Sequence, residues 1–113
     1  MLKKNYEFKN VLTKGKYYTG QLIDIVVLKN NLSINLLGLA ISKKAGNSVK
    51  RNKIKRIIRE NYRLFESDIK TGYSFVVLWK KNADFDKLSF DNIKSDFEKI
   101  YKKAYINKDK GNI

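Results

Sequence analysis

The fold of this 113-residue chain depends on one stretch, SKKAGNSVKRNKIKRIIRE, which occupies residues 42–60. Ala45-Gly46-Asn47 interrupts the chain within it, and Asn47 or Ser48 can cap a helix that continues to about Glu66. The apolar residues of this helix recur close to helical spacing and are Ile54, Ile57, Ile58, Tyr62 and Phe65. The stretch therefore predicts a long amphipathic helix, here called the motif helix, with one face packed on a sheet.

Outside the motif helix, the apolar pattern predicts two more helices and three strands. They are a helix from Asn5 to Gly15, strands over 21–28, 33–42 and 73–79, and a last helix that starts at Ser89. Asn30-Asn31 marks a turn, so we predict that the first two strands form a hairpin. This order indicates an α+β fold, a two-layer sandwich in which helices pack on a central mixed β-sheet.

The periodic patterns also predict which aromatic residues are buried and where the domain ends. The aromatic residues assigned to the core are Phe75, Trp79, Phe90, Phe97 and Tyr101. We expect a single domain over residues 1–106. The polar residues 107–113 are expected to form a disordered basic tail.

The composition favours a polyanionic partner over catalysis by the protein itself. The chain has 25 Lys and Arg residues against 11 Asp and Glu residues, a formal net charge of +14. It contains no cysteine and no histidine, which excludes disulfides and thiolate metal sites and removes the commonest general base. No apolar run is long enough to span a membrane, and the first residues lead into no signal segment. We therefore expect a cytoplasmic protein with a nucleic-acid partner and no membrane partner.

Basic residues cluster along the motif helix and the segment before it. The candidates for nucleic-acid binding are Lys43, Lys44, Asn47, Lys50, Arg51, Asn52, Lys53, Lys55, Arg56, Arg59 and Arg63. Their like charges repel, and cations in the first turn oppose the helix dipole, so a bound anion would offset both costs. Backbone N–H groups of residues 46–48 could also meet a phosphate at the helix start. The plain alternative is a solvated charged face.

Residues 42–60 resemble the signature of the bacterial ribonuclease P protein family. That signature is a strand ending in Lys-Lys, then Gly-Asn, then an Arg-Asn-Arg core followed by Lys-Arg and Arg. Lys53 stands where the core usually has Arg, which keeps the charge and loses the forked contact. Leu12 stands where many members carry a second aromatic residue on the first helix. Chain length and element order also agree, so the resemblance covers nearly the whole chain.

The resemblance implies an RNA-binding domain that is the protein subunit of a ribonucleoprotein endoribonuclease. Members assist removal of the 5′ leader from precursor transfer RNA, whereas the RNA subunit is the catalyst and holds the Mg²⁺. No catalytic residue, metal ligand or tightly bound cofactor is expected in the protein, which should be inactive alone. The implied partners are ribonuclease P RNA and the precursor leader, without a required protein oligomer. The family also has an unusual left-handed βαβ crossover around the motif helix.

A cleft between the first helix and the sheet receives the leader in this family. The leader-binding candidates are Phe8, Leu12, Tyr17 and Tyr18, because basic grooves with aromatic or apolar platforms hold single strands. Phe8 matches the family's aromatic residue on the first helix, but a plain core role would explain it equally well. Neighbouring tyrosines such as Tyr17 and Tyr18 often only cover a sheet edge.

The residues alone leave three other functions open. A structural RNA-binding protein, such as a ribosomal protein, would have the same basic helix without leader recognition. A DNA-binding regulator is disfavoured because no short turn joins two helices. A nuclease without histidine is disfavoured because the carboxylates show no spacing typical of a metal pair.

Overall fold

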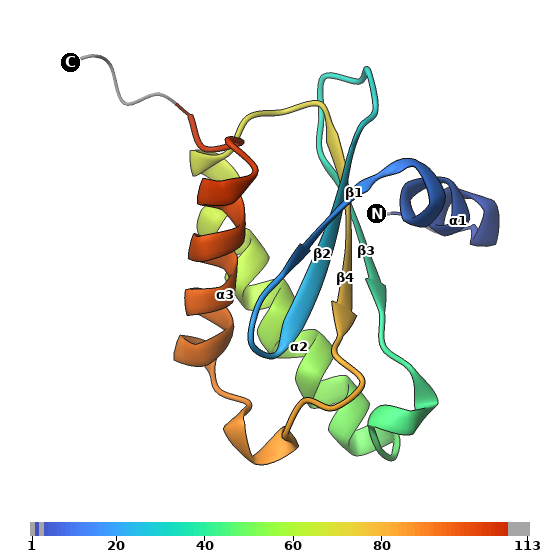
Figure 1. Ribbon diagram of the computed structural model, residues 1–113, viewed down its shortest axis with the longest axis vertical. Helices are drawn as coiled ribbons and strands as arrows, with labels where there is room; N and C mark the ends of the chain where they lie inside the picture. Colours follow the sequence, from blue (N-terminus) through green and yellow to red (C-terminus); the bar gives the residue numbers. More distant parts are fainter. Residues whose placement is uncertain (1, 3, 109–113) are drawn as a thin grey trace.

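The computed structural model describes residue 2 and residues 4–108, and Figure 1 shows how their elements are arranged. The helices are α1 (Asn5–Lys14), α2 (Ser48–Phe65) and α3 (Phe90–Lys103). The strands are β1 (Lys16–Thr19), β2 (Ile23–Lys29), β3 (Leu36–Ala40) and β4 (Tyr73–Trp79). Short 3₁₀ turns lie between them and are η1 (Lys43–Ala45), η2 (Glu66–Asp68) and η3 (Phe85–Lys87). The fold is α+β, as predicted.

The strands form one mixed sheet in the order β1-β2-β4-β3. β2 pairs antiparallel with β1 and β4, whereas β3 pairs parallel with β4. The predicted hairpin between the strands at 21–28 and 33–42 is therefore wrong, because β4 lies between them. β4 is apolar and buried along most of its length. A place between β2 and β3 therefore removes more of its apolar surface from water than a place at the sheet edge would. The turn at Asn30-Asn31 follows the end of β2, but it does not determine which strand pairs with β2.

β1 is a strand that the sequence pattern does not predict. Three of its four residues are exposed, so no apolar alternation marks it. It pairs with β2 through Tyr17 opposite Val26 and Tyr18 opposite Ile25. Its place at the sheet edge explains why so polar a segment can be a strand.

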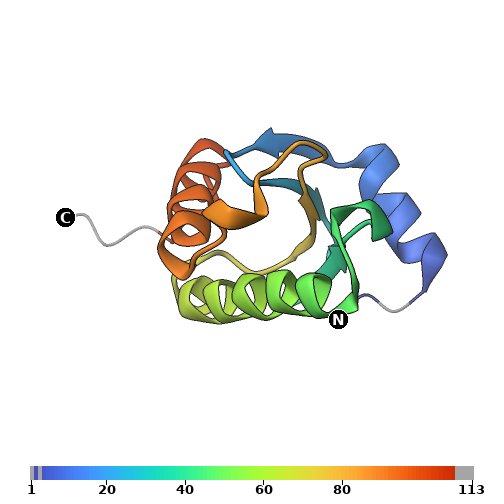
Figure 2. The same ribbon diagram turned by 90° about the horizontal axis from the view of Figure 1, so that it is seen from below.

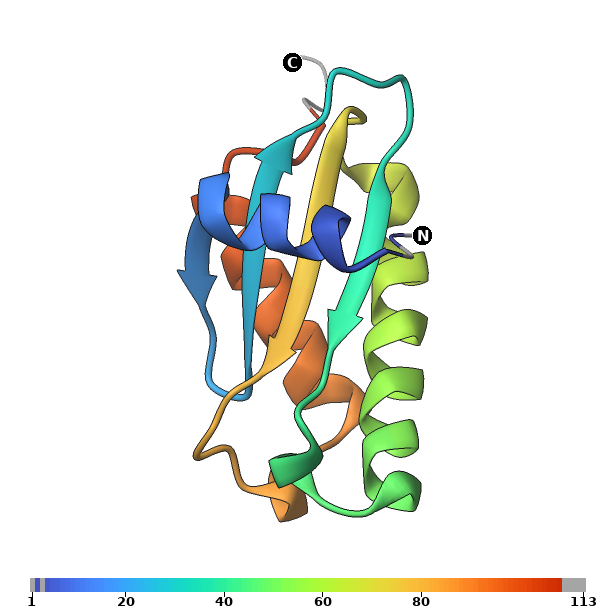
Figure 3. The same ribbon diagram turned by 90° about the vertical axis from the view of Figure 1, so that its right-hand side faces the viewer.

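Helices cover both faces of the sheet, as Figures 2 and 3 show. α2 and α3 pack together on one face and form the predicted two layers with the sheet. α1 crosses the opposite face over β2 and β4 as a short third layer. The motif helix α2 connects the parallel neighbours β3 and β4, so it lies within a βαβ crossover. The left-handed sense of that crossover stays a prediction from the resemblance.

Each layer of helices has its own apolar core. The larger core lies between the sheet and the pair α2 and α3, and its fully buried members include Ile54, Ile58 and Phe75. The smaller core lies under α1 and joins Val11 to Val26 and Val76. The two cores use alternate residues of the same strands, because successive side chains of a strand point to opposite faces.

Phe90 is the exception among the aromatic residues assigned to the core. Phe75, Trp79, Phe97 and Tyr101 are buried, whereas Phe90 is 37% exposed. Phe90 is the first residue of α3, directly after the N-cap Ser89. A helical side chain covers the turn before it, and no such turn exists at this position. The prediction for Phe90 is therefore wrong.

Asp96 of α3 holds the connection between β1 and β2. Its carboxylate oxygens accept hydrogen bonds from the backbone N–H groups of Gln21, Leu22 and Ile23 at 2.8, 2.8 and 3.2 Å. The side chain is nearly fully buried, and these three donors compensate the loss of its hydration. This carboxylate therefore has a structural role that its position in the sequence does not indicate.

The described chain stays attached to the domain up to its last residue. Ile106 is buried, Asn107 forms a β-bridge with Ile69, and the Lys108 N–H donates to the Asp68 carbonyl at 2.9 Å. Two residues of the predicted disordered tail are thus paired with the domain. The remaining tail, residues 109–113, lies outside the described residues. Within the described part of the chain, no helix has the length and apolar character needed to cross a membrane.

Candidate nucleic-acid interface

The turn before α2 is held by hydrogen bonds from side chains. The Asn47 Oδ1 accepts a hydrogen bond from the Lys50 N–H at 2.9 Å, so Asn47 is the N-cap. The Ser42 Oγ accepts one from the Lys44 N–H at 3.2 Å. Gly46 has a φ of 143°, and a Cβ there would come within 2.9 Å of the Lys50 side chain. These contacts determine where α2 begins and how its basic residues are directed.

The same turn limits the predicted phosphate contact through backbone N–H groups of residues 46–48. The Gly46 N–H donates to the Lys43 carbonyl at 3.3 Å. This group closes the 3₁₀ turn η1 and does not point to an external anion. The prediction is therefore wrong for Gly46.

The basic segment forms one exposed surface, here called the motif surface. Its exposed residues are Lys43, Lys44, Asn47, Lys50, Asn52, Lys53, Arg56, Arg59 and Arg63. Arg51 and Lys55, the other two candidates, are half-buried. The opposite side of α2 carries Ile54, Ile57 and Ile58, which are buried in the larger core. The predicted division of this helix into a charged face and an apolar face is confirmed.

Two acidic residues, Glu60 and Glu66, lie close to the nine residues of the motif surface. The Arg56 Nε and the Glu60 Oε1 are 3.9 Å apart, and their side chains are 65% and 50% exposed. A pair so open to water contributes little to stability. Among the described residues, the other ion pair of the chain joins Lys80 to Asp24, outside this surface. The positive charge of the motif surface therefore remains largely uncompensated.

An aromatic ring lies close to two of the cations. The Lys50 Nζ lies 5.0 Å and the Lys53 Nζ 5.8 Å from the centre of the Phe85 ring. Cation–π contacts of this length offset part of the repulsion among cations in the first two turns of α2. The sequence does not indicate this role of Phe85, because η3 is distant from the motif in the chain.

Three of the four leader-binding candidates share the face of the sheet that α1 crosses. The Phe8 ring lies over Gly38, where a Cβ would come within 2.6 Å of the Phe8 Cε1. Phe8 and Leu12 are half-buried and pack against the smaller core. Tyr17 is 55% exposed and lies on the same face, because it pairs with Val26. Phe8, Leu12 and Tyr17 are called the sheet surface below.

Tyr18 lies on the opposite face from the sheet surface. It pairs with Ile25 and packs against the larger core. Neighbouring residues of a strand point to opposite faces, so Tyr17 and Tyr18 cannot share one platform. The structure therefore does not bring Tyr18 together with the other three candidates.

Polar groups gather where β1 ends on the face that carries the sheet surface. The Asp24 Oδ1 accepts a hydrogen bond from the Thr19 Oγ1 at 2.6 Å and lies 3.9 Å from the Lys80 Nζ. The Lys80 Nζ also donates to the Thr19 Oγ1 at 2.8 Å and to the Gly20 carbonyl at 3.1 Å. Figure 3 shows that α1 does not cross the end of the sheet where β3 and β4 finish. This end of the face therefore combines Lys80 with the partly buried apolar residues Ala40 and Leu78.

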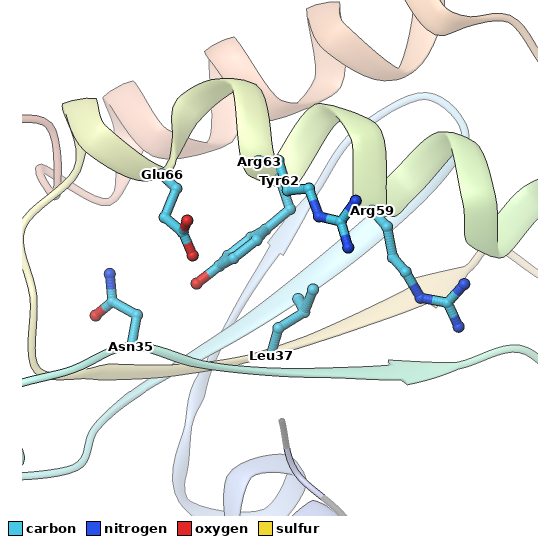
Figure 4. A pocket seen from close by; sticks show the side chains of 6 residues that line it. All are labelled: Asn35, Leu37, Arg59, Tyr62, Arg63 and Glu66. Carbon is cyan, nitrogen blue, oxygen red and sulfur yellow. The ribbon is translucent and has the colours of Figure 1, made fainter.

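A pocket of about 190 Å³ opens between α2 and the edge strand β3, as Figure 4 shows. Its lining residues are Asn35, Leu37, Arg59, Tyr62, Arg63 and Glu66. The Tyr62 hydroxyl is buried and has no hydrogen-bond partner within the described structure. Burial, and then the charge of Glu66, raises the pKa of Tyr62 to about 12, so the hydroxyl keeps its proton at neutral pH.

The sequence pattern does not indicate this pocket. Helical spacing places Tyr62 in the apolar stripe of α2, and residues 35–37 come from a different part of the chain. The pocket arises only because the sheet places β3 next to the motif helix. Over residue 2 and residues 4–108, no group of three or more His, Cys, Asp or Glu side chains could hold a metal ion.

The sequence of this chain is similar to those of a known protein family. The family model described as Ribonuclease P matches residues 1–105. The ribonuclease P protein component of Clostridium botulinum (strain 657 / Type Ba4) is 43% identical over 106 residues, covering 93% of this chain and 94% of that protein. The ribonuclease P protein component of Natranaerobius thermophilus is 40% identical over 105 residues, covering 93% and 90%.

Solved structures show the same similarity in three dimensions. The RNase P protein of Staphylococcus aureus superposes with a TM-score of 0.82 at 31% identity, covering 95% of this chain and 96% of that one. The RNase P protein of Thermotoga maritima gives a TM-score of 0.81 at 25% identity, covering 90% and 94%. The chain therefore belongs to the ribonuclease P protein family, the protein component of a ribonucleoprotein endoribonuclease that processes transfer RNA.

Proposed function

We propose that the motif surface is where this chain binds ribonuclease P RNA. The observation that supports this most is the row of exposed cations on α2, which outnumber the neighbouring acids Glu60 and Glu66. Arg56, Arg59 and Arg63 can each give a forked contact to a phosphate. Asn52 is exposed beside them and can reach a base edge or a 2′-hydroxyl. Cations held along one rigid helix suit the regularly spaced phosphates of a folded RNA.

The sheet surface is the proposed binding site for the 5′ leader of precursor transfer RNA. Phe8 and Tyr17 offer partly exposed rings, and Leu12 adds apolar area on the same face of the sheet. Unpaired bases stack on such rings with little regard to sequence, which suits leaders of different sequence. Lys80 on the same side of the sheet supplies a cation for the backbone of the strand. Tyr18 has no part in this proposal, because it faces the larger core.

The protein contributes binding, and the RNA subunit performs the cleavage with the Mg²⁺ that it holds. The cations of the motif surface lower the repulsion between catalytic RNA and substrate, two polyanions that must approach closely. The sheet surface extends recognition to the leader. One protein copy per catalytic RNA suffices for both roles, and the complex works in the cytoplasm.

Reconstitution tests this proposal directly. The full chain is mixed with a bacterial ribonuclease P RNA and a leader-bearing transfer RNA precursor at low Mg²⁺. We expect cleavage that requires the RNA and is strongly enhanced by the protein, with no cleavage by the protein alone. Tight RNA binding without enhancement at any protein ratio would instead indicate a structural RNA-binding protein of the ribosomal type.

A further inference from the structure

The pocket between α2 and β3 contains groups that phosphate binding alone does not require. Arg59 and Arg63 belong to the motif surface and stand on one side of it, as Figure 4 shows. Glu66, the Tyr62 hydroxyl and Asn35 stand on the other side. A carboxylate repels a phosphate, so the second group of residues points to a ligand that also carries hydrogen-bond donors.

The Tyr62 hydroxyl is the clearest sign of a missing ligand. Tyr62 is 5% exposed, and its hydroxyl oxygen is buried without a hydrogen-bond partner in the described structure. A buried polar group in this state carries a desolvation cost that an acceptor on a bound molecule would remove. Because the hydroxyl stays protonated at neutral pH, it can act as a donor.

Asn35 gives the pocket a fixed polar wall. Its Oδ1 accepts a hydrogen bond from the Tyr73 N–H at 2.9 Å, and its Nδ2 donates to the Lys70 carbonyl at 3.0 Å. These bonds hold the amide against the start of β4. Leu37 adds an apolar surface beside it, and the pocket is therefore shaped by rigid elements of the sheet and the helix.

A guanine base matches this arrangement better than the other three bases. Its Watson–Crick edge carries two neighbouring donors, N1–H and the N2 amino group, which fit the two oxygens of one carboxylate. Its O6 next to them is an acceptor for a hydroxyl such as that of Tyr62. Adenine, cytosine and uracil each place an acceptor beside their donor, and that acceptor would face a carboxylate oxygen.

We infer that this pocket binds an unpaired guanine nucleotide of the bound RNA, with Glu66 accepting from the base and Arg59 and Arg63 contacting its phosphate. The base is unpaired because its Watson–Crick edge is occupied in a duplex. The inference rests on the proposed function in that RNA must lie on the motif surface. It adds a guanine-selective contact to a surface whose other contacts are mainly to phosphates.

The test is an NMR titration of the full, isotopically labelled chain with three mononucleotides. They are guanosine, inosine and adenosine 5′-monophosphate, of which inosine lacks the N2 amino group. We expect guanosine monophosphate to shift the Leu37 methyl and Tyr62 ring signals. Inosine and adenosine monophosphate should bind about tenfold more weakly, because each loses a charge-assisted hydrogen bond.

Two variants make the assignment specific, and a third serves as control. Glu66→Gln should remove the preference for guanosine over adenosine monophosphate, and Tyr62→Phe should weaken guanosine monophosphate binding while the fold is retained. Glu98→Gln makes the same change at an exposed carboxylate of α3 outside this pocket and should keep the preference. Equal binding of all three nucleotides by the unmodified chain would overturn the inference, as would the absence of shifts at Leu37 and Tyr62.

This titration contains no ribonuclease P RNA, so its outcome is separate from that of reconstitution. If the chain enhances cleavage but shows no guanine preference, the proposed function is supported and the inference of a guanine site is rejected. If the chain shows the guanine preference but does not enhance cleavage, the guanine site is supported and the proposed role in the holoenzyme is rejected.

Discussion

The motif surface on α2 and the sheet surface beside α1 are connected to the core in different ways. On α2, exposed Arg56 and Arg59 are available for ligands, while separate residues such as Ile54 and Ile58 do the packing. On α1, Phe8 and Leu12 do both, because each is half-buried against the smaller core and exposes the rest of its side chain. Changes to Arg56 or Arg59 should therefore affect RNA binding alone. Changes to the sheet surface should affect stability as well.

The largest expected effect comes from removing two cations of the motif surface together. Arg56→Ala with Arg59→Ala should weaken binding of ribonuclease P RNA about 100-fold, which is about 3 kcal/mol for two charged hydrogen-bonded contacts. The slope of log affinity against log salt should fall by about 0.7–0.9 for each lost phosphate contact. Filter binding over a salt series measures both quantities.

The same double variant should unfold at the same urea concentration as the unmodified chain, because both side chains are exposed. Lys99→Ala is the matched control, since Lys99 is an exposed cation of α3 outside the motif surface. An unchanged salt slope in the double variant would remove α2 from the RNA interface. A large loss of stability would contradict the separation of binding from packing on this helix.

Gly38→Ala should give the next largest effect and should act on the other surface. The added Cβ would come within 2.6 Å of the Phe8 ring, so the ring and α1 must shift. Overpacking of this kind should lower the free energy of unfolding by about 2 kcal/mol, measured by urea denaturation. RNA binding through the motif surface should stay the same.

A double-mutant cycle shows whether Phe8 causes that loss. In a Phe8→Ala background the contact between Cβ and ring is absent, so Gly38→Ala should have a much smaller effect. An equal loss of stability in both backgrounds would mean that the strain arises elsewhere in β3, and that Phe8 is not the residue that couples the sheet surface to the fold.

Phe8→Ala by itself should separate leader recognition from general RNA binding. We expect leader-bearing precursor to bind about tenfold more weakly, since stacking of one base on an aromatic ring contributes about 1–3 kcal/mol. The affinity for mature transfer RNA should stay the same in the same holoenzyme. Tyr105→Ala is the control, because Tyr105 is an aromatic residue that is 83% exposed beyond the end of α3. Equal losses for precursor and mature RNA would indicate damage to the core.

The sequence predicts the motif surface better than the sheet surface. The pattern that marks the motif surface lies within one helix, whereas the sheet surface depends on segments far apart in the chain. The two faces of α2 follow from the spacing of Ile54, Ile58, Arg56 and Arg59 within a few turns of one helix. The signal for the strand at 73–79 is equally local, because a mostly continuous apolar run marks it, and the strand matches β4. Such features need no knowledge of how distant segments pair.

Features that depend on strand pairing could not be predicted in this way. The side of the sheet on which Tyr17 and Tyr18 lie depends on β1, a polar edge strand without an apolar pattern. The pocket at Tyr62 depends on β3 lying at the sheet edge beside α2, whereas the turn at Asn30-Asn31 indicated a hairpin with β2. In both cases the positions of the side chains depend on which strands pair, and the residues near them in sequence do not indicate that pairing.

The smallest predicted effect concerns the place where the motif surface contacts η3. Phe85→Leu keeps an apolar side chain in η3 and removes the ring that lies near the Lys50 and Lys53 ammonium groups. The free energy of unfolding should fall by about 1 kcal/mol, because a partly exposed cation–π contact contributes about 0.5–1 kcal/mol. Phe90→Leu is the control, since Phe90 is an exposed ring for which the described structure has no cation–π contact. If Phe85→Leu and Phe90→Leu have the same stability, the contact of Lys50 and Lys53 with the Phe85 ring does not stabilise the fold. A loss confined to Phe85→Leu would show that the start of α2, unlike its middle at Arg56 and Arg59, is coupled to the packing of the Phe85 ring.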